Sequence, residues 1–378
     1  MTKNGKDKLR VGIIFGGRSG EHEVSLNSAQ SVMRALNLDK YDVIPIGIDK
    51  NGRWLTGDVI GMLTEGKASS HPATLLPDPK ATGLMQLDEG ESVGITPALS
   101  VVEAAVSQLD VIFPVLHGPY GEDGTVQGLL ELANLPYVGA GVVGSAVGMD
   151  KAIFKQVMTA SGLPVLPWLL VQSHDWRQRP YKIIEQIEAI LTYPLFTKPA
   201  NLGSSVGISK CASREELQAG LDEAASYDRR IVVEQGVNVR ELEVSVLGNA
   251  EPIASVVGEV RPRREFYDYV AKYVSDDSEL IIPADLTEAQ SDEVRRLAVQ
   301  AYKAIDCAGL GRVDLLLDVD NGRFYLNEIN TIPGFTQISM YPKLWEATGL
   351  PYSQLLDKLI ALAIERHEEK ESLKKSLE

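Results

Sequence analysis

The stretch GRVDLLLDVDNGRFYLNEINTIPGFT, residues 311–336, decides the fold of this chain. It predicts two strands joined by a tight turn, because Asn321-Gly322 is a hairpin signal between two apolar runs. Asp314 lies in the first strand, and Glu328 and Asn330 lie in the second. Side chains two apart in a strand point to one face, so the hairpin is predicted to gather three oxygen ligands.

Both carboxylates of this hairpin stand inside apolar runs, VDLLL and FYLNEIN. A carboxylate in a buried run needs a cation or strong hydrogen-bond partners. Hard oxygen ligands beside an arginine, here Arg312, suit a magnesium ion held against phosphate. The alternative is a solvated hairpin face with ordinary surface carboxylates, and the apolar surroundings favour the metal site.

The composition limits the classes of protein that this chain can belong to. Its 378 residues suffice for two or three domains, and a net charge of −15 argues against non-specific nucleic-acid binding. Apolar runs stay shorter than a membrane span. The two cysteines, Cys211 and Cys307, have neither disulfide nor zinc-site spacing, so a reducing cytoplasm is expected. The polar start MTKNGKDKLR is not typical of a signal peptide.

The N-terminal part alternates strands and helices. A strand at 10–15 leads through GGRSGEHE into a helix, and a second strand follows at 41–48. This order predicts a parallel sheet, which a further strand at 109–116 would extend. Loops at the carboxyl ends of parallel strands bind ligands, so GGRSGEHE and HGPYGEDG are expected to face one crevice.

Residues 51–107 are weakly patterned and are expected to be insertions around a meander. The irregular segment 261–282 is expected to be a mobile loop. The remaining patterns predict strands at 167–171, 230–235, 242–247 and 253–260, and helices at 125–133, 151–162, 181–191, 288–304 and 352–368.

A second group of residues suits phosphate. In KPANLGSSVGISK, glycines flank Ser204 and Ser205, so backbone N–H groups and hydroxyls could cradle phosphate oxygens beside Lys198. Lys151 opens a helix and would add a second charge. The spacing matches neither a Walker A loop nor a Rossmann fingerprint. A flexible hairpin with a surface lysine remains the alternative.

A connector after the strand at 230–235 could hold a purine base. Adenine is often bound by backbone groups of such a connector, and Glu234 could accept from its amino group. Glu241 could accept from ribose hydroxyls. Taken alone, both glutamates could equally be ordinary surface acids.

Taken together, these segments resemble the D-alanine–D-alanine ligases, a family within the ATP-grasp superfamily. The matching motifs are GGRSGEHEVSLNS, HGPYGEDGTVQG, GMDK, KPANLGSSVG, FYDYVAKY, GRVDLLLD and LNEINTIPGFTQISMYP. They occur in family order from Val11 to about Arg366. The resemblance implies three α/β domains, with ATP held between the last two. The expected ranges are 1–140 for a Rossmann-like domain, 141–235 for the central ATP-grasp part and 236–378 for the C-terminal part with a lid at about 261–282.

The resemblance also implies a reaction. One D-alanine carboxylate attacks the γ-phosphate of ATP to give an acyl phosphate, and the amine of a second D-alanine displaces phosphate, yielding D-alanyl-D-alanine for peptidoglycan synthesis. Two Mg²⁺ ions are implied, with Mn²⁺ as a substitute. A cytoplasmic homodimer without membrane or nucleic-acid partners is implied as well.

Residue roles follow from the matching motifs. The resemblance implies catalytic roles for Glu21, Ser204, Arg312, Tyr273 and Gly334. It implies D-alanine contacts for Glu21, His117, Lys272, Arg312, Gly334, Ser339 and Met340. It implies ATP contacts for Lys151, Lys198, Ser204, Ser205, Glu234, Gln235, Val237, Glu241, Lys272, Asn327 and Glu328. It implies metal ligation by Asp314, Glu328 and Asn330.

Other functions would need different residues or would share only part of this pattern. A relative that joins D-alanine to D-lactate or D-serine would share the site, but the resemblance implies that Tyr273, with Ser204 and Glu21, favours D-alanine; Tyr273 could instead be a packing aromatic. A nucleotide-binding protein without catalysis has no need of the complete hairpin set. A dehydrogenase would need GxGxxG, which GGRSGE lacks. His22 and His117 lack a third metal ligand.

Overall fold

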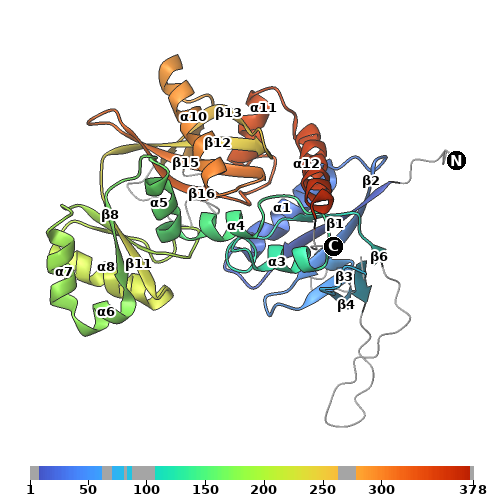
Figure 1. Cartoon of the computed structure of the whole chain (residues 1–378), viewed down its shortest axis with the longest axis horizontal. Helices are drawn as coiled ribbons and strands as arrows, with labels where there is room; N and C mark the ends of the chain where they lie inside the picture. Colours follow the sequence, from blue (N-terminus) through green and yellow to red (C-terminus); the bar gives the residue numbers. More distant parts are fainter. Residues whose placement is uncertain (1–7, 62–69, 81–82, 87–106, 263–277, 375–378) are drawn as a thin grey trace, which may run out of the picture.

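The computed structural model describes residues 8–61, 70–80, 83–86, 107–262 and 278–374. These residues form three sheets of seven, four and five strands, arranged as three lobes around a common centre (Figure 1). Lys272 and Tyr273, to which the sequence assigns substrate roles, lie outside the described residues. Within those residues, no helix combines the length and the apolar character needed to cross a membrane.

The first sheet has the strand order β6-β5-β4-β3-β2-β1-β7. Its parallel part consists of β2 (Tyr41–Ile48), β1 (Leu9–Gly16) and β7 (Val111–Pro114). The other four strands pair antiparallel: β3 (Trp54–Gly57), β4 (Ser70–Leu75), β5 (Gly83–Gln86) and β6 (Ser107–Gln108). The parallel sheet predicted from the strands at 10–15, 41–48 and 109–116 is confirmed, and the described strands within 51–107 form the predicted meander. A hairpin needs only a short turn, whereas a parallel crossover needs a dozen or more residues.

The second sheet has the order β10-β9-β11-β8, and its pairs are antiparallel. Its strands are β8 (Trp168–Gln172), β9 (Leu195–Pro199), β10 (Ser209–Cys211) and β11 (Arg230–Gln235). Helices α6 (Ser173–Gln178), α7 (Pro180–Glu188) and α8 (Arg214–Tyr227) belong to the same lobe. One hydrophobic cluster, drawn from residues 171–233, fills the space between them.

The third sheet has the order β14-β13-β12-β15-β16. Its strands are β12 (Val239–Gly248), β13 (Ile253–Pro262), β14 (Ser278–Ile281), β15 (Gly309–Asp318) and β16 (Phe324–Asn330), with α10 (Glu288–Ala304) packed against them. The predicted hairpin is confirmed as β15 and β16. The irregular loop predicted for 261–282 is wrong at both ends, because Arg261 pairs with Glu279 in an antiparallel ladder.

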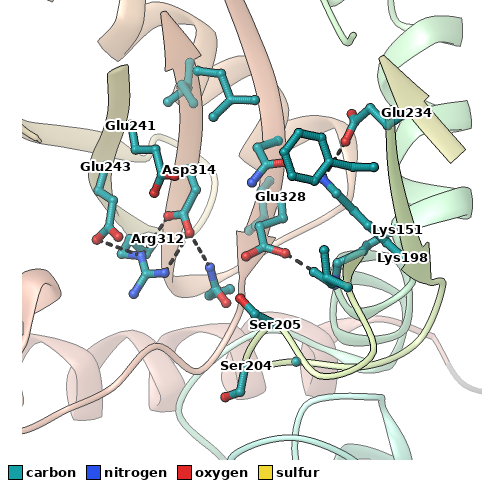
Figure 2. Close-up of a pocket in the computed structure, with 18 of the residues that line it drawn as sticks. Lys151, Lys198, Ser204, Ser205, Glu234, Glu241, Glu243, Arg312, Asp314 and Glu328 are labelled. Carbon is teal, nitrogen blue, oxygen red and sulfur yellow. Dashed lines mark hydrogen bonds and ion pairs between the residues drawn. The ribbon is translucent and has the colours of Figure 1, made fainter. Parts of the chain in front are cut away.

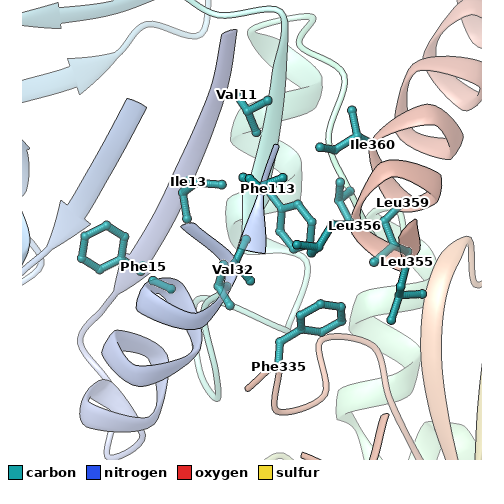
Figure 3. Packing of buried hydrophobic residues seen from close by; sticks show 14 of the residues in the cluster. Val11, Ile13, Phe15, Val32, Phe113, Phe335, Leu355, Leu356, Leu359 and Ile360 are labelled. Atoms are coloured by element: carbon teal, nitrogen blue, oxygen red, sulfur yellow. The ribbon is translucent and has the colours of Figure 1, made fainter. Parts of the chain in front are cut away.

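The first and third lobes share one core. Val11 and Phe113 of the first sheet meet Phe335 and Leu359 in a single buried cluster (Figure 3). Leu359 belongs to α12 (Tyr352–Ser372), which extends four residues beyond its predicted end. Helix α1 (His22–Ala35), which belongs to the N-terminal lobe, packs against α12.

Four further helices complete the fold: α3 (Thr125–Leu132), α4 (Val142–Met149), α5 (Lys151–Ala160) and α11 (Met340–Ala347). The sequence analysis missed α4, α6 and α11, which span eight residues or fewer and so show little periodicity. Phe154 and Met158 of α5 pack into the core of the third sheet. The domain boundaries at 140 and 235 remain a prediction. Helix α5 follows the boundary at 140, which would assign it to the central domain, yet it packs on the third lobe.

Candidate active site

A cleft of about 810 Å³ lies where the three lobes meet, and Figure 2 shows its walls. Its volume is within the range usual for a small-molecule site. It brings together sixteen of the residues singled out in the sequence: Glu21, His117, Lys151, Lys198, Ser204, Ser205, Glu234, Gln235, Val237, Glu241, Arg312, Asp314, Asn327, Glu328, Asn330 and Gly334.

The hairpin forms one wall of the cleft. In its register Asp314 lies opposite Glu328, and Arg312 lies opposite Asn330. The Arg312 guanidinium donates to both oxygens of Asp314, with Nε–Oδ1 at 2.7 Å and Nη2–Oδ2 at 2.6 Å. Its Nε also lies 3.0 Å from Glu243 Oε2, on the neighbouring strand β12. Two carboxylates therefore hold the arginine at the cleft wall, which explains how these charges tolerate burial.

The hairpin residues fit a divalent cation by their chemistry. Asp314, Glu328 and Asn330 offer carboxylate and amide oxygens, which Mg²⁺ prefers over nitrogen or sulfur. Asn330 Nδ2 lies 3.0 Å from Asp314 Oδ2. A half-turn of the amide group would present Asn330 Oδ1 at the same place, since the amide oxygen and nitrogen are interchangeable in position.

Lys151 and Lys198 line the opposite wall of the cleft, and Lys155 is buried against Glu234 of the same wall. Lys155 and Lys198 each donate to one oxygen of Glu234, the latter at 2.5 Å. Lys155 and Glu234 are almost fully buried, with 1% and 2% of their side chains exposed. Lys151 Nζ donates to the Leu202 carbonyl at 2.7 Å and lies 3.4 Å from Glu328 Oε2. Lys151 therefore links α5, the glycine–serine loop and the hairpin.

The electrostatics of the lysine wall follow from burial and pairing. Burial alone would raise the pKa of Glu234, but the charges of Lys155 and Lys198 outweigh it and lower that pKa to about 2. Burial lowers the pKa of Lys155 despite its carboxylate partner. For Lys198, burial acts in the same direction, but attraction to Glu234 wins and raises its pKa. Lys198, which faces the cleft, is thus held as a cation.

The glycine–serine loop reaches the N-terminal lobe through Glu21. Ser204 Oγ donates to Glu21 Oε1 across 183 residues of sequence. Ser204 and Ser205 adopt positive φ angles of 53° and 58°, a strained conformation for residues other than glycine. A Cβ at Gly203 would stand 3.2 Å from Glu21 Oε2, so glycine allows this close approach.

Glu21 also contacts the HGPYGEDG loop. A Cβ at Gly118, whose φ is +76°, would stand 2.7 Å from Glu21 Oε2. In the same loop His117 is buried, and its Nδ1 lies 3.9 Å from Glu122 Oε1. Burial, with the charge of Glu21, raises the pKa of Glu122 to about 8. Burial lowers the pKa of His117 against the attraction of Glu21. The imidazole is therefore neutral at neutral pH.

The comparisons with known proteins agree with each other. Residues 10–140 match the family described as D-ala D-ala ligase N-terminus, and residues 157–361 match D-ala D-ala ligase C-terminus. The chain belongs to the D-alanine–D-alanine ligase family. It is 52% identical to the D-alanine–D-alanine ligase of Heliobacterium modesticaldum over 96% of this chain and 97% of that one. It is 48% identical to the ligase of Geobacillus thermodenitrificans, over 97% of this chain and 98% of that one.

Solved structures of the family share the fold. The VanG D-Ala:D-Ser ligase from Enterococcus faecalis has a TM-score of 0.81 at 35% identity, covering 94% of this chain and 100% of that one. The D-alanine–D-alanine ligase from Coxiella burnetii has a TM-score of 0.80 at 37% identity, covering 96% of each chain. The predicted family and the predicted α/β fold of ATP-grasp architecture are confirmed.

Two predicted substrate residues of this ligase-family chain lie beside the cleft rather than in its lining. Ser339 Oγ accepts the Thr336 N–H at 3.1 Å, and a Cβ at Gly334 would stand 3.3 Å from it. Met340 packs with Val260 and Leu344 in a small buried cluster. Among the described residues that line the cleft, neither Ser339 nor Met340 is found, so their substrate roles stay a prediction.

Charged residues of the site that were not singled out in the sequence include Glu122, Lys155 and Glu243. Glu122 belongs to the quoted HGPYGEDG motif, Lys155 follows Lys151 by one helical turn, and Glu243 follows Glu241 by two in a strand. The spacings i, i+4 in a helix and i, i+2 in a strand place Lys155 beside Lys151 and Glu243 beside Glu241. That periodicity was the available signal.

Proposed function

We propose that this protein joins two D-alanine molecules at the expense of ATP, releasing ADP and phosphate, to make D-alanyl-D-alanine for peptidoglycan. The observation that carries the proposal is the convergence, in one cleft, of Lys151 and Lys198 with Arg312 and the oxygen cluster of the hairpin. Phosphoryl transfer needs alignment and charge neutralisation more than a protein nucleophile.

The nucleotide is assigned to the wall between the second and third sheets. Lys151 and Lys198 would contact phosphate oxygens, with Ser204, Ser205 and their backbone N–H groups closing over them. Glu234, Gln235 and Val237 would contact adenine, and Glu241 would contact the ribose. The remaining assigned contacts are Lys272, Asn327 and Glu328.

Divalent ions are assigned to Asp314, Glu328 and Asn330, two Mg²⁺ ions with Mn²⁺ as a substitute. When bound, they would neutralise charge on the phosphate groups. Arg312, held at the cleft wall by Asp314 and Glu243, would stabilise charge on the transferring phosphoryl group. Glu243, which lies 3.0 Å from the same Nε that donates to Asp314, would help to keep the guanidinium at the cleft wall.

The chemistry has two steps. In the first, a carboxylate oxygen of D-alanine attacks the γ-phosphorus and ADP leaves, while Glu21 holds the ammonium group of that D-alanine and His117 packs beside it. In the second, the neutral amine of the other D-alanine attacks the acyl carbon. Arg312 and the Gly334 N–H would stabilise the oxyanion of the tetrahedral intermediate before phosphate leaves. Ser339, Met340, Lys272 and Tyr273 would complete the acceptor side.

Further assignments rest on family membership. We assign the ranges 1–140, 141–235 and 236–378 as domains, the segment at about 261–282 as the lid, a homodimer as the assembly and the cytoplasm as the compartment. Cys211 and Cys307 are both buried free thiols, which is compatible with a reducing compartment.

The test is phosphate release from Mg·ATP, with products identified by mass. The arms are D-alanine alone, D-alanine with D-lactate, D-alanine with D-serine, and L-alanine. Release with D-alanine alone, giving D-alanyl-D-alanine, supports the proposal. Release only with D-lactate or D-serine would keep the mechanism and overturn the acceptor. No release in any arm would overturn the enzyme assignment.

A further inference from the structure

Three serines of α1 face away from their own helix toward other segments. Ser25, Ser28 and Ser31 follow each other at intervals of three, so they lie along one side of α1. Ser25 Oγ accepts the Gly16 N–H at 2.7 Å, and Ser31 Oγ accepts the Gln337 N–H at 3.2 Å. Helical serines commonly turn back to a carbonyl one turn earlier, and these hydroxyls instead join separate parts of the chain.

Ser28 is fully buried and lies between a cleft residue and the loop that carries Gly334. Its Oγ lies 3.2 Å from His117 Nε2 and 3.4 Å from the Phe335 nitrogen. On the other side of the imidazole, His117 Nδ1 lies 3.0 Å from the Ile332 carbonyl oxygen. The imidazole thus stands between Ser28 and residue 332.

The direction of each hydrogen bond follows from the atoms. A carbonyl oxygen only accepts, so His117 Nδ1 must carry the proton. In a neutral imidazole Nε2 then only accepts, so the Ser28 hydroxyl must donate to it. Because that proton is used, Ser28 Oγ is free to accept the Phe335 N–H. The hydrogen bonds between Ile332 and His117, between His117 and Ser28 and between Ser28 and Phe335 form a closed ring with the chain segment 332–335. Gly334 is one of the residues of that segment.

These donor and acceptor directions require a neutral His117 imidazole. The charges around the ring are compatible with a neutral imidazole. Glu122 faces His117 from the same loop, and Glu21 faces it from the GGRSGEHE loop. Glu122 has its pKa raised to about 8 by burial and by Glu21, so it is largely protonated near pH 7. Burial lowers the pKa of His117 itself. A fully charged carboxylate pair beside the ring would have favoured imidazolium.

We infer that Ser28 is a positioning residue, which fixes the Nδ1–H tautomer of His117 and the orientation of the Gly334–Phe335 peptide through one ring of hydrogen bonds. Its value for catalysis rests on the proposed function, because His117 and the Gly334 N–H, which belongs to the preceding peptide of the same ring, are there assigned to D-alanine and the oxyanion. The tautomer and the ring geometry do not rest on it.

The first experiment needs no substrate. The full-length protein is labelled with ¹⁵N-histidine, and the His117 signals are assigned among five histidines with a His117→Gln variant. We expect a protonated Nδ1 and an accepting Nε2 at pH 7, with the Nε2 signal moving toward that of a non-bonded nitrogen in Ser28→Ala. A protonated Nε2, a charged ring, or identical spectra in Ser28→Ala would overturn the inference whether or not the protein is a ligase.

The second experiment measures the consequence for turnover. Ser31→Ala is the matched control, because it removes a hydroxyl from the same face of α1 and the same loop without touching His117. We expect Ser28→Ala to lower kcat about 10- to 100-fold with KM for ATP within about twofold, and Ser31→Ala to lower kcat less than threefold. Ser28→Cys, with a weak S–H donor, should fall between wild type and Ser28→Ala.

The outcomes separate positioning from bulk structure. Equal losses in Ser28→Ala and Ser31→Ala, accompanied by equal falls in melting temperature, would overturn the positioning role. A loss expressed in KM for ATP rather than in kcat would do the same, since the ring does not contact the nucleotide wall. If the wild type joins no D-alanine at all, the proposed function fails, and the ¹⁵N spectra alone decide the inference.

Discussion

Replacing Glu234 by glutamine should destabilise the protein more than any surface substitution of the same kind. The change keeps the volume of the side chain and removes its charge. It leaves Lys155 and Lys198 facing each other, and 1% and 13% of their side chains are exposed. Breaking a buried ion pair by removing one partner costs about 3–5 kcal/mol, because the remaining charge stays buried without compensation.

The pKa of Glu234 gives a second route to the magnitude. Its value of about 2, against an ordinary value of 4.5, corresponds at about 1.4 kcal/mol per pH unit to about 3 kcal/mol. A depressed carboxyl pKa stabilises the fold above the unfolded value, near pH 4.5, and that stabilisation is lost as the pH falls toward 2. The full contribution is therefore present at pH 7. We expect Glu234→Gln to lower the free energy of unfolding by about 3 kcal/mol.

The pH dependence of the variant should have a defined sign. Burial already lowers the pKa of Lys155, and loss of Glu234 removes the attraction that opposes this. A lysine whose pKa is lower in the folded than in the unfolded protein lowers the free energy of unfolding while it must be deprotonated or buried as a cation. This cost falls as the pH rises, because the unfolded chain binds more protons than the folded one. The difference in free energy of unfolding between wild type and Glu234→Gln should therefore decrease from pH 6 to pH 9.

The assay is urea unfolding followed by circular dichroism at four pH values from 6 to 9. Glu188→Gln is the control, because Glu188 pairs with Arg214 on the surface of the same lobe, where ion pairs contribute little. Equal losses of free energy of unfolding in Glu234→Gln and Glu188→Gln would refute the reasoning about the buried pair. So would a difference between wild type and Glu234→Gln that increases as the pH rises.

The remaining predictions concern the cleft. Arg312→Ala should lower turnover at least 10³-fold while ATP affinity, measured by calorimetry, changes less than about threefold; near-normal turnover would remove its assigned role. Asp314→Asn should raise the Mg²⁺ concentration for half-maximal activity about tenfold or more, and an unchanged titration would exclude it as a ligand. Gly334→Ala should lower kcat about tenfold, because the new Cβ stands 3.3 Å from Ser339 Oγ; an unchanged kcat would argue against an oxyanion role. Tyr273→Phe should raise the share of D-alanyl-D-lactate when both acceptors compete, and a constant product ratio by mass would contradict the specificity argument.

The hairpin could be predicted because its information is local. Alternation in two runs and the Asn321-Gly322 turn set both strands, and Gly322 adopts the positive φ of 71° that such turns require. The register places Asp314 opposite Glu328, as the metal hypothesis needs. The register shift after Asp314, where Leu315 pairs with Leu326 and Asn327 is passed over, could not be predicted, because nothing in the alternation of either strand marks the extra residue.

The buried charges could not be predicted from local patterns. Lys151 and Lys155 occupy equivalent positions on α5, one turn apart, yet one lines the cleft and the other is buried against Glu234. Their difference arises from β11, which is about eighty residues away in sequence. The same applies to α12, whose apolar side was visible in the sequence but whose partner, the first sheet, was not. Periodicity indicates that a face is buried and does not say against what.

The three lobes are joined unequally, and this has a consequence for how the cleft closes. The first and third lobes share one apolar core, whereas the second lobe has a core of its own and reaches the first through polar groups such as Ser204 and Glu21. The second sheet also packs on α5 through Ala152, Ala200 and Val232, so its freedom to move is greatest relative to the first lobe, to which its contacts are polar. Glu21 is also the residue assigned to the ammonium group of the first D-alanine. Binding of D-alanine and closure of the glycine–serine loop would then use the same carboxylate, so the loop that covers the phosphates would close most firmly when the substrate site is occupied. This coupling would protect the acyl phosphate from water at the moment it forms.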